Sequence, residues 1–122
     1  MQELMWVALG GGAGSVARYF VGRIFGPEPA FPWGTFIVNT VGSLVAGFLV
    51  GYLATRLSGN VRLGLLVGFL GGFTTFSSFA VESAGLLRNG QTVTASLNLV
   101  GSVVVALIAC LLGIVIGESV SR

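Results

Sequence analysis

Long stretches of hydrophobic residues without a charged side chain make up most of the chain. They are Leu4–Ala17, Pro29–Thr55, Leu63–Val81 and Asn89–Gly117. The apolar core of a bilayer requires roughly 20 residues per helix, so the last three stretches are long enough to cross it. The first is long enough if Arg18 lies within the span or extends its charged end toward the headgroups. The pattern therefore predicts four transmembrane helices in a single domain, residues 1–122.

The polar residues between these stretches define the expected helix ends. Proline and glycine cluster in 26–32, and Ser, Gly and Asn with flanking arginines in 55–62, both typical of loops. We therefore expect helices over Leu4–Phe25, Trp33–Ala54, Leu63–Arg88 and Thr92–Ile116. An alternative for the first segment is a cleaved signal peptide, but it lacks the basic start and the small-residue cleavage site typical of one.

The stretch from Gly71 to Phe79, GGFTTFSSF, interrupts the third predicted helix. Two glycines followed by two threonines are poor helix formers, because Gly loses much backbone freedom and a Thr hydroxyl competes for backbone hydrogen bonds. We expect a break near the middle of this helix. Backbone carbonyls that such a break frees cannot face lipid, so protein, water or a bound ion must satisfy them. The stretch is therefore a candidate ion site.

Two of the predicted helices carry polar residues at intervals of four, which places each set on one helix face. Thr35, Asn39 and Ser43 form such a stripe in the second helix, and Thr94, Asn98 and Ser102 form another in the fourth. An Asn amide in hydrocarbon requires a partner, and its two N–H donors suit an anion as well as a neighbouring helix. Both interpretations, an anion pathway and helix-to-helix contacts, fit the spacing.

Aromatic rings and hydroxyls lie directly after the expected break. Phe76 and Phe79 are three residues apart and share a face if this segment is helical, with the hydroxyls of Thr75 and Ser78 beside them. A phenyl ring has a positive edge, which can accept an anion. Simple packing of the rings is the alternative.

Composition fixes the class of protein: 54% of the 122 residues are hydrophobic, 8% are charged and the mean hydropathy is +0.96. These values predict an all-α integral membrane protein. Four short helices can hardly enclose a pathway alone, so we expect an oligomer. Glycines repeat at intervals of four in the predicted helices, a spacing that lets helices approach closely, either between subunits or within one.

Arginines are spread evenly over the two expected sides of the membrane. One side holds Arg56, Arg62 and Arg122, and the other holds Arg23, Arg88 and, if it belongs near that end, Arg18. Because an excess of positive charge normally fixes orientation, this balance predicts insertion in both orientations and an antiparallel, dual-topology homodimer. Arg18 is either an anchor at the membrane boundary or a charge in a water-filled vestibule that attracts anions.

Several kinds of chemistry are excluded. The chain contains no His, Asp or Lys, so catalytic triads, His metal sites and Lys nucleophiles cannot form. Cys110 is the single cysteine, and the sequence contains no phosphate loop or basic tract typical of nucleic-acid binding. We expect Glu82, near the membrane boundary, to be solvated or paired with an arginine. The sequence therefore predicts no enzyme and points to permeation.

Three ordered motifs carry a resemblance to a known family. GGGAGSVARYF in the first helix, GTFIVNTVGS in the second, and GFLGGFTTFSSF with Glu82 in the third resemble the signature motifs of the bacterial fluoride channel family, CrcB or Fluc. The match extends over nearly the whole chain. It implies a dual-topology homodimer in the cell inner membrane, with two pores and a structural sodium ion (Na⁺) at the dimer centre.

The resemblance also implies residue roles. The sodium ion would be held by the backbone carbonyls of Gly71 and Thr74, and Arg18 would lie in the vestibule. The fluoride pathway would be lined by Asn39, Phe76, Phe79, Thr75, Ser77, Ser78, Asn98 and Ser102. The implied function is passive export of fluoride down its electrochemical gradient, which protects the cell from fluoride toxicity. A small four-helix multidrug-type exporter and a non-transporting membrane assembly subunit are the alternatives.

Overall fold

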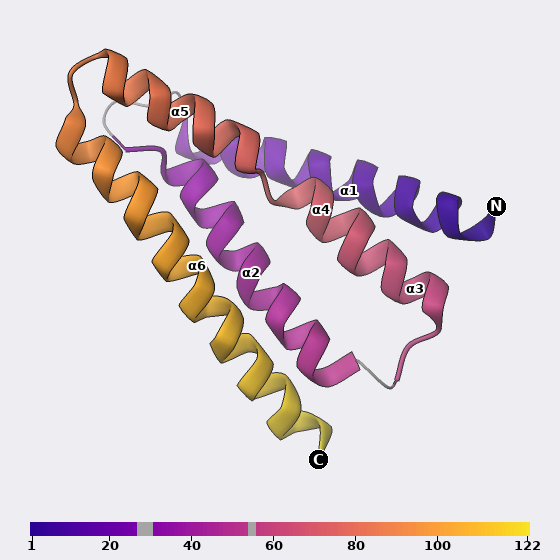
Figure 1. Cartoon of the computed structure of the whole chain (residues 1–122). Helices are drawn as coiled ribbons and strands as arrows, with labels where there is room; N and C mark the ends of the chain where they lie inside the picture. Colours follow the sequence, from indigo (N-terminus) through magenta and orange to yellow (C-terminus); the bar gives the residue numbers. More distant parts are fainter. Residues whose placement is uncertain (27–30, 54–55) are drawn as a thin grey trace.

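The computed structural model describes residues 1–26, 31–53 and 56–122, and all regular structure in these ranges is helical. The described elements are α1 (Gln2–Phe25), α2 (Trp33–Leu53), α3 (Gly59–Leu63), η1 (Gly64–Leu70), α4 (Gly71–Phe73), α5 (Phe76–Arg88) and α6 (Thr92–Ser121). The elements α3, η1, α4 and α5 follow one another in a single rod that changes direction between α4 and α5 (Figure 1). The described chain thus forms the four helical rods that the hydrophobic pattern predicts.

The helix bounds agree with the expected ones except at some ends. Helix α1 begins at Gln2 rather than Leu4, and α6 continues to Ser121, beyond the expected end at Ile116. The third rod begins at Gly59, inside the stretch that we expected to be a loop. The expected end of the second helix at Ala54 lies outside the described residues, as does most of the expected loop over 26–32. Charged residues therefore did not mark the helix ends, since α6 continues past Glu118 and the third rod includes Arg62.

Three rods among the described residues are long and apolar enough to cross a membrane: Trp33–Leu53, Gly59–Arg88 and Thr92–Ser121. Helix α1 is not among them, because Arg18 and several glycines lower its hydropathy. Large apolar side chains cover the outside of the rods, as Val93 and Val100 of α6 illustrate with exposures of 75% and 65%. Such a surface is stable in lipid and not in water.

Helices α2 and α6 lie side by side along most of their lengths (Figure 1). Their backbones approach so closely that a Cβ atom at Gly47 would collide with the carbonyl oxygen of Cys110. A Cβ atom at Gly113 would likewise collide with the carbonyl oxygen of Leu44. Small residues of this kind allow close van der Waals packing of the backbones, which drives helix association in lipid, where the hydrophobic effect does not act between helices.

Helix α1 packs in the same manner against the first half of the third rod. A Cβ atom at Gly10 would collide with the carbonyl oxygen of Gly64, and one at Gly14 with that of Phe69. The glycine repeats in these two pairs of rods therefore serve packing within the subunit. The alternative that they form a contact between subunits is wrong for these positions.

The segment η1 is a π-helix of seven residues, Gly64–Leu70, which no sequence pattern predicted. Its turns close with hydrogen bonds to the fifth residue along, rather than the fourth. It leads directly into α4 and the change of direction that follows. Such segments are rare in proteins as a whole, and those that occur often lie near functional sites.

Candidate functional site

The third rod is interrupted at Thr74 and Thr75, so the predicted helix break is confirmed. Both residues are extended, with φ −82° and ψ 153° at Thr74 and φ −148° and ψ 118° at Thr75. Thr75 then caps α5, because its Oγ1 accepts a hydrogen bond from the backbone N–H of Ser78 at 3.2 Å. Gly71 and Gly72, to which the prediction attributed the break, remain helical.

Asn39 of α2 holds the break open. Its Nδ2 donates to the carbonyl oxygen of Thr75 at 3.0 Å, and its Oδ1 accepts from the backbone N–H of Thr75 at 2.7 Å. One side-chain amide thus replaces the backbone partners that the interruption removes. Because Nδ2 carries two hydrogens, one N–H remains for a further partner. The two interpretations of Asn39, a contact between helices and a donor to an anion, are therefore compatible.

The carbonyl groups around the break have unequal partners. The Leu70 oxygen accepts from the backbone N–H of Thr74 at 2.9 Å and from its Oγ1 at 2.8 Å. The Gly72 oxygen accepts from Nε of Arg18 at 3.0 Å. In a continuous helix the N–H of Thr75 would donate to the Gly71 oxygen, but it donates to Oδ1 of Asn39 instead. Likewise, the N–H of Ser78 would donate to the Thr74 oxygen, but it donates to Oγ1 of Thr75. The Gly71 and Thr74 oxygens therefore lack their helical donors.

A groove of about 440 Å³ runs beside the break. Its walls include Asn39, Ser43, Thr74, Phe76, Phe79 and Ser102. The two phenyl rings lie 5.5 Å apart, centre to centre, at a tilt of 47°. They differ in exposure, since Phe76 is 78% exposed and Phe79 only 7%. The structure thus brings most of the predicted pathway residues to one groove.

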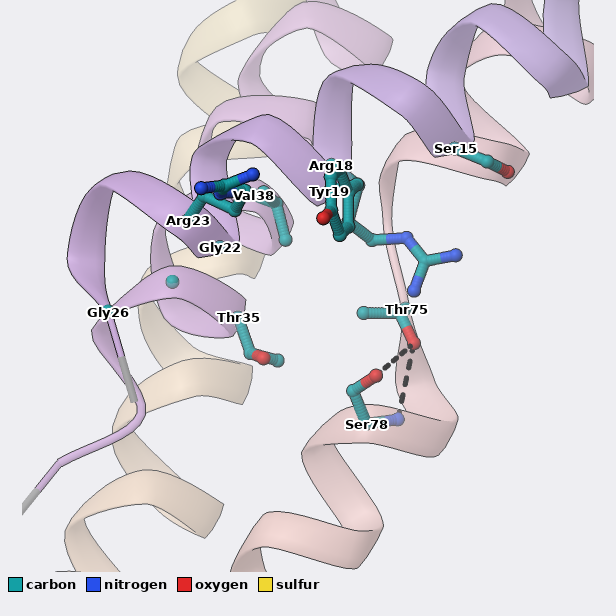
Figure 2. Close-up of a pocket in the computed structure, with 11 residues that line it drawn as sticks. Ser15, Arg18, Tyr19, Gly22, Arg23, Gly26, Thr35, Val38, Thr75 and Ser78 are labelled. Atoms are coloured by element: carbon teal, nitrogen blue, oxygen red, sulfur yellow. Dashed lines mark hydrogen bonds between the residues drawn. The ribbon is translucent and has the colours of Figure 1, made fainter. Parts of the chain in front are cut away.

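A second cavity, of about 700 Å³, lies on the other side of the break (Figure 2). Arg18 and Arg23 of α1 line it together with Thr35, Thr75 and Ser78. Two guanidinium groups and several hydroxyls give this cavity a positive potential and neutral donors, which favours anions. The prediction named Arg18 for a vestibule but not Arg23, although its spacing of five residues from Arg18 keeps it near the same end of the helix.

The hydroxyls after the break form a small cluster around Thr75. Its Oγ1 lies 3.3 Å from Oγ of Ser77 and donates to Oγ of Ser78 at 3.2 Å. Thr75 is buried and lines both the groove and the cavity, whereas Ser77 is exposed. Thr75 is thus the hydroxyl that faces both spaces.

Asn98 and Ser102 form a buried chain of hydrogen bonds between α6 and α5. Oγ of Ser102 donates to Oδ1 of Asn98 at 2.9 Å, and Nδ2 of Asn98 donates to Oγ of Ser83 at 2.9 Å. Oγ of Ser83 in turn donates to the carbonyl oxygen of Phe79 at 2.7 Å. The predicted stripe therefore reaches the phenylalanine through Ser83, which the sequence did not single out, and only Ser102 of the two lines the groove.

Glu82 of α5 is bonded to the second rod. Its Oε1 accepts a hydrogen bond from Oγ1 of Thr35 at 2.7 Å, and the residue is partly buried. We expected Glu82 to be solvated or paired with an arginine; the hydrogen bond from Thr35 is a partner that this expectation did not include. Thr35, one turn before Asn39, had been recognised only as part of a polar stripe, and its partner 47 residues away carried no local signal.

Comparison with known proteins identifies the family. A family model described as "CrcB-like protein, Camphor Resistance (CrcB)" matches residues 5–114. The chain belongs to the CrcB family. This confirms the resemblance that the three sequence motifs carry, and it extends the match to most of the fourth rod.

Three relatives of this CrcB chain illustrate the similarity, and each bears the name fluoride-specific ion channel FluC. The protein from Novosphingobium aromaticivorans is 47% identical over 126 residues, which cover 99% of this chain and 100% of the relative. That from Sphingopyxis alaskensis is 48% identical, with 95% of each chain covered. That from Coxiella burnetii is 44% identical, with 95% of this chain and 98% of the relative covered.

Proposed function

We propose that this CrcB protein is a fluoride-selective channel that lets fluoride leave the cell passively, down its electrochemical gradient, and so protects the cell from fluoride toxicity. Its relatives are named as ion channels, and the chain is not an enzyme. The observation that carries the proposal is the groove at the break, where an Asn amide, hydroxyls and two phenyl rings meet without a charged side chain among its lining residues. This lining suits a small anion.

Neutral donors match what conduction of fluoride requires. Moving a bare anion into a medium of low dielectric costs on the order of tens of kcal/mol, so the pathway must replace its water at every step. The free N–H of Asn39, the hydroxyl of Thr75 and the ring edges of Phe76 and Phe79 can do so. Each binds weakly enough for the ion to leave, whereas a full positive charge in a narrow passage would retain it.

The cavity beside Arg18 and Arg23 would concentrate the anion before it enters. Two guanidinium groups at a water-filled opening raise the local concentration of anions. Thr75 lines both this cavity and the groove, which makes it the step between them. Ser77, Ser78, Asn98 and Ser102 complete the proposed pathway.

We further propose that α1 crosses the membrane as a fourth span. It contains 24 residues, enough for the bilayer core, and Arg18 is bonded to the Gly72 carbonyl of the third rod rather than facing lipid. The protein would then be a four-span protein of the cell inner membrane.

An antiparallel homodimer in the lipid bilayer would close the groove. Phe76 is 78% exposed on one subunit although it lies at the centre of the site, and a second copy would cover it. The even distribution of arginines supports insertion in both orientations. No nucleic acid takes part in this assembly.

A structural sodium ion would occupy the dimer centre, held by the carbonyl oxygens of Gly71 and Thr74. The residues fit such an ion, because both oxygens lack their helical donors and hard cations prefer oxygen ligands. Gly71 also has an ordinary helical conformation and open space at its Cβ position within the subunit. Gly71→Ala should therefore leave the subunit intact and weaken sodium binding only if the ion or the partner lies there.

Flux from liposomes tests the proposed function. Purified protein should release fluoride at a rate that depends on voltage and not on a pH gradient. Proton-coupled efflux of organic cations would instead support a small multidrug-type exporter, and the absence of any flux would support an assembly subunit. Either result would refute the channel.

Labelling of a single cysteine tests dual topology. Cys110 is first replaced by alanine, and Ser121→Cys then places one thiol at the end of α6. We expect an impermeant thiol reagent to label about half of the molecules from each side, as an equal mixture of orientations requires. Labelling from one side alone would contradict the antiparallel dimer.

A further inference from the structure

The bond between Arg18 and the Gly72 carbonyl oxygen has a geometry that attraction of anions does not require. Nε, the nitrogen closest to the backbone, makes this bond at 3.0 Å, across 54 residues of sequence. The two terminal nitrogens of the guanidinium group remain for the cavity that Arg18 lines. One side chain thus serves the vestibule with its outer end and the helix break with its inner end. Figure 2 shows the guanidinium group of Arg18 extending toward Thr75.

The backbone around this bond is held rigidly on both sides. A Cβ atom at Gly72 would collide with the carbonyl oxygen of Gly11, and one at Gly14 would lie only 2.9 Å from the backbone nitrogen of Phe73. The backbones of α1 and α4 are therefore in direct contact one to two turns before Arg18. Rigid contact of this kind fixes the position of Nε relative to the last turn of α4.

We propose that Arg18 is a positioning residue for the cation site at the break. By binding the Gly72 oxygen, it holds the last turn of α4 so that the neighbouring Gly71 oxygen, together with that of Thr74, stays turned toward a cation. Asn39 does the same from the other side, by holding the backbone of Thr75. This inference rests on the sodium site of the proposed function and adds the residue that sets its affinity.

The sign of the charge makes the proposal testable. A positive guanidinium near a sodium ion repels it, so loss of the charge alone should tighten sodium binding. Loss of the hydrogen bond should weaken it, because the carbonyl groups are no longer held in place. The two roles therefore predict opposite changes.

Two neutral substitutions separate these roles. Arg18→Gln keeps an N–H donor, because its amide nitrogen is the same number of bonds from the backbone as Nε of arginine. Arg18→Met has similar length and no donor. Arg23→Gln removes a charge from the same cavity and is the matched control.

The readout is the sodium concentration that half-maximally raises the thermal midpoint of the purified dimer. Sodium is exchanged for N-methyl-D-glucamine at constant ionic strength, so that screening does not change. We expect Arg18→Gln and Arg23→Gln to bind sodium as tightly as the wild type or more tightly. Because both Arg18 variants lack the charge, Arg18→Met should need roughly tenfold more sodium than Arg18→Gln, the effect of losing one hydrogen bond.

Equal sodium affinities in Arg18→Gln and Arg18→Met would overturn the proposal. If Arg18→Met yields no dimer, Arg18→Lys replaces it, since lysine keeps the charge but lacks a donor at the position of Nε. Its sodium affinity should then fall below that of the wild type, and an unchanged affinity would overturn the proposal.

Fluoride efflux is measured on the same samples. If the wild type releases fluoride but Arg18→Gln and Arg18→Met have equal sodium affinities, only the role of Arg18 is rejected. A wild type without efflux rejects the channel, and one without a response to sodium rejects the cation site.

Discussion

Replacement of Asn39 by aspartate tests the groove most directly. The change keeps the acceptor for the N–H of Thr75 and exchanges the Nδ2 donor for an oxygen, which then lies against the Thr75 carbonyl oxygen at the site of a 3.0 Å hydrogen bond. The lost bond costs about 1 kcal/mol, and the unpaired carbonyl adds about 1–3 kcal/mol. We therefore expect the break to be destabilised but not abolished.

The effect on flux should be larger than the effect on stability. A negative charge about 4 Å from a passing anion repels it by about 4 kcal/mol at an effective dielectric constant of about 20. Since about 1.4 kcal/mol corresponds to a factor of ten, fluoride efflux from liposomes should fall by roughly three orders of magnitude.

Asn39→Leu is the matched control, because it removes both hydrogen bonds to Thr75 and adds no charge. For the same loss of thermal midpoint, Asn39→Asp should lower the flux more than Asn39→Leu, because only the aspartate places a negative charge on the pathway. The reasoning is refuted if the aspartate variant conducts at the wild-type rate, or if the loss of flux in both variants simply follows the loss of stability.

The remaining predictions concern the phenyl rings and the glycine contacts. Phe76→Ile and Phe79→Ile should both reduce fluoride efflux while the oligomeric state on size exclusion stays that of the wild type, and wild-type rates of efflux would mean that the rings only pack. Because Phe79 is only 7% exposed within the subunit, Phe79→Ile should also lower the free energy of unfolding, on the order of 1–2 kcal/mol. Gly113→Ala should prevent recovery of folded protein, since its Cβ meets the Leu44 carbonyl oxygen, whereas Gly12→Ala has open space within the subunit and should express normally. Equal yields of the two alanine variants would contradict the close contact.

The number of rods and the existence of a break could be predicted from the sequence, because both depend on local composition. Charge-free length predicts the rods, and the poor helix formers between Gly71 and Thr75 predict a break, although the two glycines remain helical and the two threonines form it. The exact position of the break could not be predicted. Thr75 leaves the helix because Asn39, 36 residues away, offers its backbone a donor and an acceptor.

Partners of the polar side chains were the least predictable feature. Spacing of four residues correctly placed Asn98 and Ser102 on one face, but it could not show that Ser83 links them to the carbonyl group of Phe79. Likewise, the bond of Arg18 to Gly72 depends on how α1 crosses the third rod. Such contacts follow from tertiary packing, which local periodicity does not specify.

The π-helical winding of Gly64–Leu70 changes the direction in which the later residues of the third rod point. A wider turn accommodates an additional residue, so each later residue points in a different direction from the one it would have in an α-helix of the same sequence. The direction of the Gly71 carbonyl group is thus decided partly by residues that do not line the groove, such as Leu65. Deletion of Leu65 would keep every residue that lines the groove and would turn the Gly71 oxygen in another direction.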